Sequence, residues 1–420
     1  MSSSPDLAIA SGAAVRRSLL PPSATTDAAR LIAARMVRAF ADGMVSVLLP
    51  AYLSRLGRDA AEIGAIATAT LLGSAVLTLG LGLRSHRWPA KALLLCACAL
   101  MAATGFGFAS ASAFAPLLLI GFVGTLNPTA GDVSVFLPLE QSLLASQVEG
   151  TDLAALYARS NVAAGAAAAL GAAASALPVP IGALFGLPAI DGLRLAFFVY
   201  ALAAATAALL YSGLRAATAT SLAPRAPLVR SRAIVLRLSA LFTLDSFGGG
   251  FVAQSLLALW LFQRFAFSLA DAAGFFFATS LLSGASQLLS PVLARRIGFV
   301  RTMVFTHLPA NLFLIAAAFM PSAELAVTCL LLRMALASMD VPVRQAFVMS
   351  VVPVEERAAA AAVTNVPRSL GSSAAPLLSG YLLAASSFGW PLVIAGSLKV
   401  LYDLLLLRGY QHHVEKETQP

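Results

Sequence analysis

The sequence predicts an all-α polytopic membrane protein with twelve transmembrane helices in two pseudo-symmetric six-helix bundles. Three observations support this prediction: the apolar composition, the regular spacing of apolar runs, and a repeat that relates the two halves. Of the 420 residues, 59% are hydrophobic and 11% are charged, whereas a soluble globular chain is about 45–50% apolar and about 25% charged. The mean hydropathy of +0.85 excludes a large soluble domain, and with it most soluble enzyme folds.

The apolar runs are long enough to cross a bilayer, which requires about 20 residues per helix. Charged residues, glycines and prolines divide the chain into twelve candidate helices. These are residues 33–55, 62–83, 90–110, 113–143, 153–178, 191–213, 236–262, 270–293, 301–320, 323–352, 357–386 and 390–408. The fourth, tenth and eleventh are longer than a bilayer needs, so we expect them to tilt, kink or project into the cytosol.

The segments between these helices predict the domain organisation. We expect a flexible cytosolic N-terminal tail over 1–30, an N-terminal bundle over 31–213, a central cytosolic loop over 214–233, a C-terminal bundle over 234–408 and a cytosolic tail over 409–420. The Pro, Ser and Arg content of the central loop is typical of an irregular linker at a membrane surface.

The cations predict the orientation. The formal charge is +9, from 28 Lys and Arg against 19 Asp and Glu. Sixteen cations fall in segments predicted to be cytosolic, and four (Arg55, Arg58, Arg194 and Arg264) fall on the opposite side. This asymmetry places both termini in the cytosol and accounts for the high pI without a nucleic-acid partner. The alanine- and arginine-rich composition is associated with GC-rich bacterial genomes, so we expect a multi-pass protein of the bacterial inner membrane.

The two halves share polar residues in a common register. Pro138, Glu140, Gln141 and Asn161 in the first half correspond to Pro342, Arg344, Gln345 and Asn365 in the second, each pair separated by 204 positions. Asp42 in the first helix and Asp245 in the seventh are 203 positions apart. A parallel duplication of six helices is the physical interpretation.

Twelve helices in two parallel repeats, joined by a basic loop, resemble the major facilitator superfamily over essentially the whole chain. The segment from Val352 to Arg357 is similar to the Pro-x-x-x-Arg run that this superfamily often has between helices ten and eleven. Asp42 followed by Leu49-Pro50 resembles the first helix of many of its exporters. The loop after the second helix lacks the Asp of the usual pattern, and the fifth helix lacks the Gly-Pro step of drug/proton antiporters. The resemblance therefore implies a transporter fold without naming a substrate.

Ionisable groups at bilayer depth require either a charged partner or a function. Asp42 is the first candidate for substrate binding or proton coupling, since it lies one helical turn from Arg38 and a carboxylate beside a cation can bind and release a proton. A structural ion pair between the two is the alternative. Asp245 occupies the equivalent place in helix seven and precedes three glycines, Gly248 to Gly250, which permit either a hinge or close helix packing. Gln254 is a candidate wall residue of the site.

Helices four and ten supply further candidates near the middle of the membrane. Pro128 leaves a backbone carbonyl free in helix four, beside Asn127 and Asp132. Helix ten contributes Arg333 and Asp340. These two charges either bind a zwitterion or anion, or neutralise each other.

Charged residues nearer the cytosolic ends predict a gate network that closes one side and separates in the other state. Its members are Arg38, Glu140, Arg159, Arg344 and Arg368. Four amides are expected to hydrogen-bond between neighbouring helices: Gln141, Asn161, Gln345 and Asn365. In helix twelve, Lys399 and Asp403 are one turn apart, which predicts a self-neutralising pair.

His307 is the one histidine inside a predicted helix. It is a candidate for proton handling, with a buried, hydrogen-bonded imidazole as the alternative. A single histidine is too few for a metal site, so we expect neither a metal nor a cofactor.

These features favour a monomeric secondary active transporter that moves a small organic solute by alternating access between two bundles. No G-x-x-x-x-G-K-[ST] nucleotide-binding loop is present, so ATP is not the expected driver. We expect an ion gradient, of protons, to supply the energy. Export is favoured by the resemblance of the first helix, and uptake by proton symport is the alternative. A membrane-embedded enzyme is disfavoured because paired catalytic groups are lacking, and a channel is disfavoured because the duplicated halves suit moving bundles.

Overall fold

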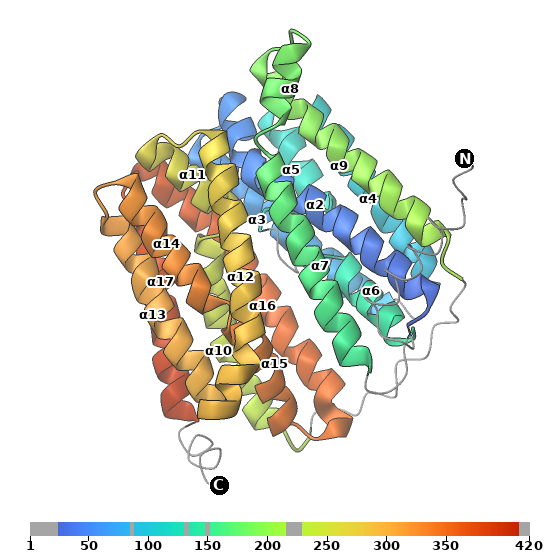
Figure 1. Ribbon diagram of the computed structural model, residues 1–420, viewed down its shortest axis with the longest axis vertical. Coiled ribbons are helices and arrows are strands. Elements are labelled where there is room, and N and C mark those ends of the chain that lie inside the picture. Colours follow the sequence, from blue (N-terminus) through green and yellow to red (C-terminus); the bar gives the residue numbers. More distant parts are fainter. Residues whose placement is uncertain (1–23, 85–87, 130–133, 148–151, 216–228, 411–420) are drawn as a thin grey trace, which may run out of the picture.

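The computed structural model describes residues 24–84, 88–129, 134–147, 152–215 and 229–410. Within these ranges the chain is helical apart from turns and short connections, and they contain no strand. The first half of the chain lies on the right of Figure 1 and the second half on the left. The predicted all-α class is confirmed.

The described part of the first half contains eight helical segments. They are α2 (Thr26–Arg55), α3 (Ala60–Arg84), α4 (Ala90–Ser110), α5 (Phe114–Val123), α6 (Phe136–Ala145), α7 (Asp152–Ala174), α8 (Pro178–Leu184) and α9 (Ala189–Ser212). The second half contains α10 (Arg232–Phe251), α11 (Gln254–Phe265), α12 (Leu269–Ile297), α13 (Phe299–Phe319), α14 (Ala323–Ala337), α15 (Asp340–Val351), the 3-10 turn η2 (Val354–Glu356), α16 (Arg357–Ala385) and α17 (Trp390–Gly409).

Every predicted apolar range contains helix, and the described residues include eight helical spans long and apolar enough to cross a membrane, with α10 and α11 counted as one span and α14 and α15 as another. The number is nine if α7 and α8, which meet at 47°, form one broken span. A multi-pass helical membrane protein is therefore confirmed. The count of twelve crossings and the cytosolic position of the termini stay predictions.

Three of the ranges expected as single helices are broken. The fourth divides into α5 and α6, the seventh into α10 and α11, and the tenth into α14 and α15. In the fourth, Gly124 is extended, and Asn127 Oδ1 accepts a hydrogen bond from the Thr129 N–H at 3.0 Å. This Asx turn competes with helical hydrogen bonding. In the tenth, the Ser290 hydroxyl of α12 donates to the Met339 carbonyl at 2.6 Å and so satisfies a backbone group freed by the break.

The predicted N-terminal tail over 1–30 was too long. Helix α2 begins at Thr26 because Thr25 is its N-cap and accepts a hydrogen bond from the Ala28 N–H. Asp27 in the first turn pairs with Arg30 at 2.8 Å, as the helix dipole favours. The predicted central loop also ends early, since α10 begins at Arg232; residues 1–23, 216–228 and 411–420 lie outside the described part.

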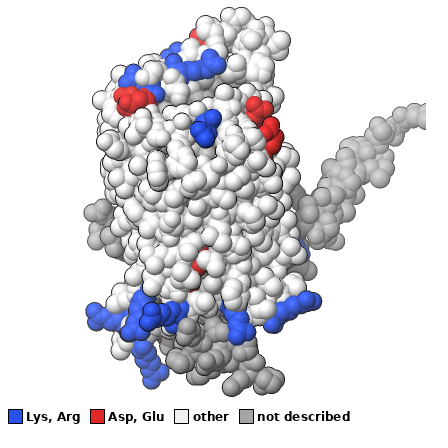
Figure 2. Space-filling model, turned by 90° about the vertical axis from the view of Figure 1, so that its left-hand side faces the viewer, with Lys and Arg blue, Asp and Glu red and all other residues white. Residues whose placement is uncertain are grey.

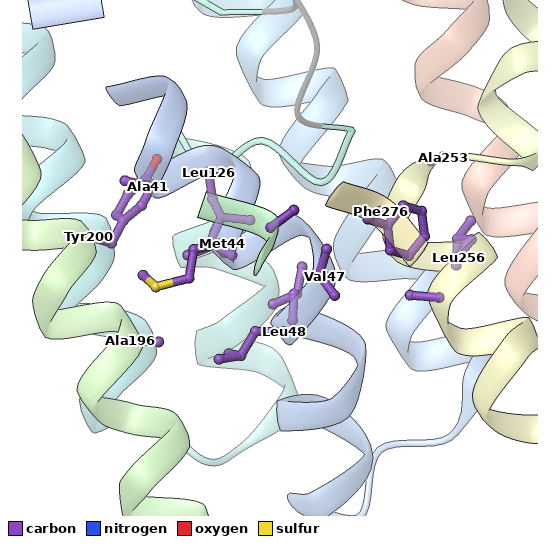
Figure 3. Packing of buried hydrophobic residues seen from close by; sticks show 14 of the residues in the cluster. Ala41, Met44, Val47, Leu48, Leu126, Ala196, Tyr200, Ala253, Leu256 and Phe276 are labelled. Atoms are coloured by element: carbon purple, nitrogen blue, oxygen red, sulfur yellow. The ribbon is translucent and has the colours of Figure 1, made fainter. Parts of the chain in front are cut away.

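The buried apolar core extends across both halves at one end of the molecule and is divided at the other. One cluster joins α2 to α9 within the first half and to α11 and α12 of the second (Figure 3), with Met44 near Tyr200 and Val47 towards Phe276. A separate cluster lies at the end of the second half where α10 begins and α17 ends. We call this end, where α2 begins and α17 ends, the base, and the opposite end the top.

Close backbone contact joins the halves at the top. Gly64, near the start of α3, packs so tightly on α16 that an added Cβ would lie 2.5 Å from the Pro376 carbonyl oxygen and 2.8 Å from the Gly380 Cα. Nearby, the Ser255 N–H of α11 donates to the Pro128 carbonyl at 3.1 Å. The top therefore closes the space between the halves.

Charge is distributed unequally between the two ends. Figure 2 shows a wide and almost uncharged belt, interrupted by one small acidic patch, between an upper end with both cations and carboxylates and a lower end where cations gather. The helix termini at the base of the second half carry Arg232, Arg295, Arg296, Arg301 and Arg408. An uncharged belt bounded in this way suits a bilayer.

Candidate functional site

The first half contains a buried ion pair between α2 and α6. Arg38 Nη2 lies 2.6 Å from Glu140 Oε1, and the two residues are 5% and 1% exposed. Tyr211 of α9 connects them, because its hydroxyl donates to Glu140 and accepts from Arg38 Nε at 3.2 Å. The Arg38 guanidinium also stacks 3.8 Å from the Phe136 ring centroid. Arg38 is thus fully engaged by the first half.

This geometry corrects the alternative in which Arg38 and Asp42 form a structural pair. The anionic partner of Arg38 is Glu140, which reaches it from a different helix. Asp42 Oδ1 is buried and has no hydrogen bond with a described residue, while the Tyr200 hydroxyl and the Arg38 charge act on the carboxyl group as a whole. A buried carboxylate oxygen without a partner is costly, and a proton or a cationic group would remove that cost.

The second half contains a larger network centred on Asp245 of α10. Its carboxylate lies 2.5 Å from Lys399 Nζ of α17 and 3.0 Å from Arg344 Nη1 of α15. Arg344 also lies 3.2 Å from Asp340, one turn earlier. Two predicted pairs are therefore wrong. Lys399 reaches across to α10 instead of to Asp403, and Asp340 pairs with Arg344 instead of with Arg333.

His307 of α13 joins this network to the other carboxylate of α17. Its Nδ1 lies 2.9 Å from Asp403 Oδ1, and its Nε2 lies 3.8 Å from Asp245 Oδ1. The Asn311 amide donates to Asp403 Oδ2 at 3.0 Å. His307 and Asp403 are 4% and 0% exposed, so the histidine is buried and hydrogen-bonded, and a role in proton handling stays a prediction.

Each half contains a buried ion pair at an equivalent position, but the positive and negative residues are exchanged between the halves. Glu140 and Arg344 occupy equivalent positions, 204 residues apart, and each pairs with the first helix of its own half. Their partners, Arg38 and Asp245, are 207 residues apart. This separation exceeds the repeat of 204 residues by about one helical turn. The sequence repeat thus becomes a spatial repeat of buried ion pairs between helices.

The break between α14 and α15 lies against a polar face of α12. The Ser283 and Ser338 hydroxyls are 2.7 Å apart, and Ser290 bonds the Met339 carbonyl. Ser286, between these serines on α12, has a buried hydroxyl with no described hydrogen-bond partner. Arg333 contacts the Met334 sulfur at 3.1 Å, and its Nε has no described hydrogen-bond partner.

The other expected site residues are more dispersed. Asn127 is buried in the break of the fourth range, Gln254 is partly exposed at the start of α11, and Asp132 lies outside the described residues. Arg159 is exposed and has no ion pair with a described carboxylate. Arg368 donates to Ser246 at 3.1 Å and to Asn365 at 3.2 Å.

The predicted gate network is therefore not one cluster. Arg38 pairs with Glu140 inside the first half, and Arg344 pairs with Asp245 and Asp340 inside the second. Among the described residues, the four amide side chains also do not form the expected hydrogen bonds between neighbouring helices. The side chains of Gln141, Asn161, Gln345 and Asn365 are exposed, and among the described residues the side-chain hydrogen bond of this set comes from Arg368, on the helix of Asn365 itself.

Some members of these networks were not anticipated. Tyr211 lies at the end of an apolar helix, where nothing in the sequence marks it. The sequence did indicate Asn311, because it follows His307 by one helical turn and lies on the same face of that helix. The partners of Lys399 and Asp403 depend on which helices pack together, which single-helix spacing does not define.

Helices in two repeated halves, with buried ion pairs at equivalent places, define a polytopic membrane protein built from a duplicated bundle. The family model "Major Facilitator Superfamily" matches residues 31–339, and the chain belongs to this superfamily. It is accordingly a transporter and not an enzyme.

Known proteins similar to this chain agree with that assignment. An uncharacterized membrane protein of Saccharomyces cerevisiae, YJR124C, is 24% identical, covering 91% of this chain and 94% of its own length. The crystal structure of a D-xylose–proton symporter superposes with a TM-score of 0.73 at 15% identity, covering 90% of this chain and 96% of that one. The nucleoside transporter NupG gives a TM-score of 0.68 at 15% identity, covering 92% and 100%.

Proposed function

We propose that this protein is a monomeric secondary active transporter that exports a small organic solute by alternating access, in exchange for protons, across a bacterial inner membrane. The observation that carries proton coupling is Asp42. Its Oδ1 is buried and unbonded, while the nearest cation on its own helix, Arg38, is engaged by Glu140. A carboxylate in this setting takes up a proton or a cationic group more readily than one already paired.

The distribution of ion pairs supports alternating access. The strong pairs lie inside each half, between α2 and α6 and among α10, α15 and α17. The halves meet at the top through glycine backbone contact and apolar packing. Separating contacts of this kind costs less free energy than separating buried ion pairs. Each half is therefore suited to move as a unit, with its own ion pairs intact.

The base, with its excess of cations, is the proposed cytosolic end. The top contact between α3 and α16 then closes the outer side, and the exposed polar side chains of Gln141, Asn161, Gln345 and Asn365 line a route that opens to the cytosol. Water in such a route satisfies the amides without partner helices.

Solute flux in proteoliposomes tests the proposal. Purified protein is reconstituted with a pH-sensitive dye inside the vesicles and challenged with sugars, nucleosides and amphipathic organic ions. Wild-type protein should move one class of solute against its gradient when a pH gradient is imposed, with protons moving the opposite way. Asp42→Asn should lose this gradient-driven flux while retaining solute counterflow.

The matched control is Asp191→Asn, because Asp191 is a solvent-exposed carboxylate that pairs with Arg194 at 2.9 Å. It should transport like the wild type. If protons and solute move in the same direction, the proposed export is wrong and the protein is a symporter that takes up its solute. If solute moves without protons in both the wild type and the variant, proton coupling is refuted.

A further inference from the structure

Two arginines of the second half are partly buried without a carboxylate partner among the described residues. Arg333 of α14 contacts the Met334 sulfur at 3.1 Å, and its Nε has no hydrogen bond with a described residue. Arg368 of α16 donates to the neutral side chains of Ser246 and Asn365, at 3.1 and 3.2 Å. A cation at bilayer depth without a counter-charge is costly and marks a candidate functional site.

Both guanidinium groups act on one buried centre from different helices. The charges of Arg333 and Arg368 both act on Asp245 of α10. The Asp245 carboxylate is already engaged, by Lys399 Nζ at 2.5 Å and by Arg344 Nη1 at 3.0 Å. The two arginines therefore converge on the same region of the second half, while its central carboxylate is bound to other cations.

The charges of this network leave an excess of positive charge. Its cations are Arg333, Arg344, Arg368 and Lys399, and its carboxylates are Asp245, Asp340 and Asp403. Four cations against three carboxylates give a net positive charge even when every carboxylate is ionised. An anion bound beside the arginines would supply the missing negative charge, and their attraction is strong where water is excluded.

The free donors of the two arginines suit an oxyanion. A guanidinium has five N–H donors in a planar fork that matches the geometry of a carboxylate or a phosphate. Arg368 uses Nε and Nη1 on neutral oxygens, and Arg333 uses Nη1 on a thioether, which is a weak acceptor. Among the described residues, Nε of Arg333 and Nη2 of both arginines have no acceptor.

We propose that Arg333 and Arg368 form a subsite for an oxyanion group, a carboxylate or a phosphate, of a soluble organic anion, and that this anion is the transported solute. The identity of the bound anion as the solute rests on the proposed transport function, whereas its binding does not. The subsite belongs to the second half, and Asp42 of the first half is not part of it.

Thermal stabilisation of the full-length protein in maltoside detergent tests the binding, because a ligand of the folded state raises its melting temperature. The probes are benzoate, succinate and glycerol phosphate, each beside its uncharged counterpart, benzamide, succinamide or glycerol. At least one soluble anion should stabilise the wild type more than its counterpart does. Its dissociation constant should rise more than about tenfold in Arg333→Gln and in Arg368→Gln.

Two results of this panel would overturn the proposal. One is that no anion stabilises the wild type more than its uncharged counterpart. The other is stabilisation by phosphatidylglycerol, added as a further probe, without stabilisation by any soluble anion; the arginines would then bind a lipid headgroup.

Matched variants separate a binding role from a structural one. Arg264 is an exposed arginine without an ion pair to a described carboxylate, so Arg264→Gln should bind the anion like the wild type. Arg333→Lys retains the charge without the fork and should bind with intermediate affinity. Without a probe, Arg333→Gln should melt no lower than the wild type, because it removes an uncompensated charge. A lower melting temperature with unchanged anion binding would show a structural role and overturn the proposal.

Transport in proteoliposomes separates this inference from the proposed function. Anion binding that depends on both arginines, without flux driven by a pH gradient, would support the subsite and contradict proton-coupled transport. Gradient-driven flux of an uncharged solute that Arg333→Gln and Arg368→Gln leave unchanged would support coupled transport and overturn the anion subsite.

Discussion

Arg38 and Glu140 show how strongly individual residues of this protein depend on their partners. Removing one member of a buried pair leaves the other charged and desolvated, at a typical cost of about 3–5 kcal/mol. We therefore expect Glu140→Gln to lower the free energy of unfolding by about 3 kcal/mol, measured by circular dichroism during SDS titration in detergent. The double variant Arg38→Met/Glu140→Leu should recover most of this loss.

The exposed pair of Asp191 and Arg194 provides the comparison. Asp191→Asn should change stability by less than about 1 kcal/mol. If Glu140→Gln costs no more than Asp191→Asn, Arg38 does not depend on Glu140 as described.

Glu356 predicts a pH dependence outside the membrane-spanning helices. The Ser231 hydroxyl and the backbone N–H groups of Arg230, Ser231 and Val229 donate to its carboxylate and lower its pKa to about 2. Because the folded pKa lies below the unfolded value of about 4.3, this stabilisation is complete above that value and is lost as the pH falls towards 2.

The melting temperature of Glu356→Gln should therefore lie below that of the wild type at neutral pH, and the gap should shrink as the pH falls below about 4.3. Differential scanning fluorimetry in detergent measures the gap. If the difference in melting temperature is the same above and below about pH 4.3, the ionised carboxylate does not have this role.

At the residue scale, the sequence identified the charged residues of the buried networks more accurately than it identified the partners of those residues. Asp245, Arg344, Glu140 and His307 were recognised because a charge in an apolar run is costly. The predicted pair Lys399–Asp403 was wrong, and the alternative pair Arg38–Asp42 was replaced by Arg38–Glu140. Spacing along one helix shows which residues share a face, but not which helix packs on it.

At the scale of the helices, the contact between α3 and α16 depends on the absence of side chains. A side chain at Gly64 would meet the α16 backbone at Pro376 and Gly380, and overpacking of this kind costs about 1–3 kcal/mol. Gly64→Val should therefore destabilise the arrangement closed at the top and shift the protein towards one in which these helices separate. The extent of reaction of a cysteine placed at Ala61 with a membrane-impermeant maleimide measures that shift.

Gly165→Val is the control, because nothing lies within 4 Å of a Cβ added there. It should leave the labelling unchanged. Equal labelling of the two variants would show that the glycine contact does not hold the top closed.

The breaks within helices mark a limit of sequence-based prediction at this scale. Pro128 and the glycines before Phe251 indicated weak points, and the structure has breaks after Val123 and at 252–253. The break after Ala337 had no such marker. It depends on Ser283 and Ser290 of α12, which a pattern within the tenth range does not contain.

For the whole molecule, alternating access requires the two halves to move as units about contacts that alternate between top and base. The apolar core is continuous between the halves at the top, whereas the base of the second half has a core of its own. The composition predicted a helical membrane protein, and the repeat predicted two related halves. Which end is closed depends on packing between the halves, which neither composition nor repeat contains.

Distances between spin labels test this movement most directly. One pair is placed at the top, on Ser54 and Ser387, and a second at the base, on Ser146 and Ser350; all four residues are exposed or lie at helix ends. Cys96, Cys98 and Cys329 are first replaced by alanine. We expect a short top distance and a long base distance in the state closed at the top, with opposite changes in the two pairs when solute and pH are varied. Two distances that stay fixed, or that lengthen together, would contradict alternating access by rigid halves.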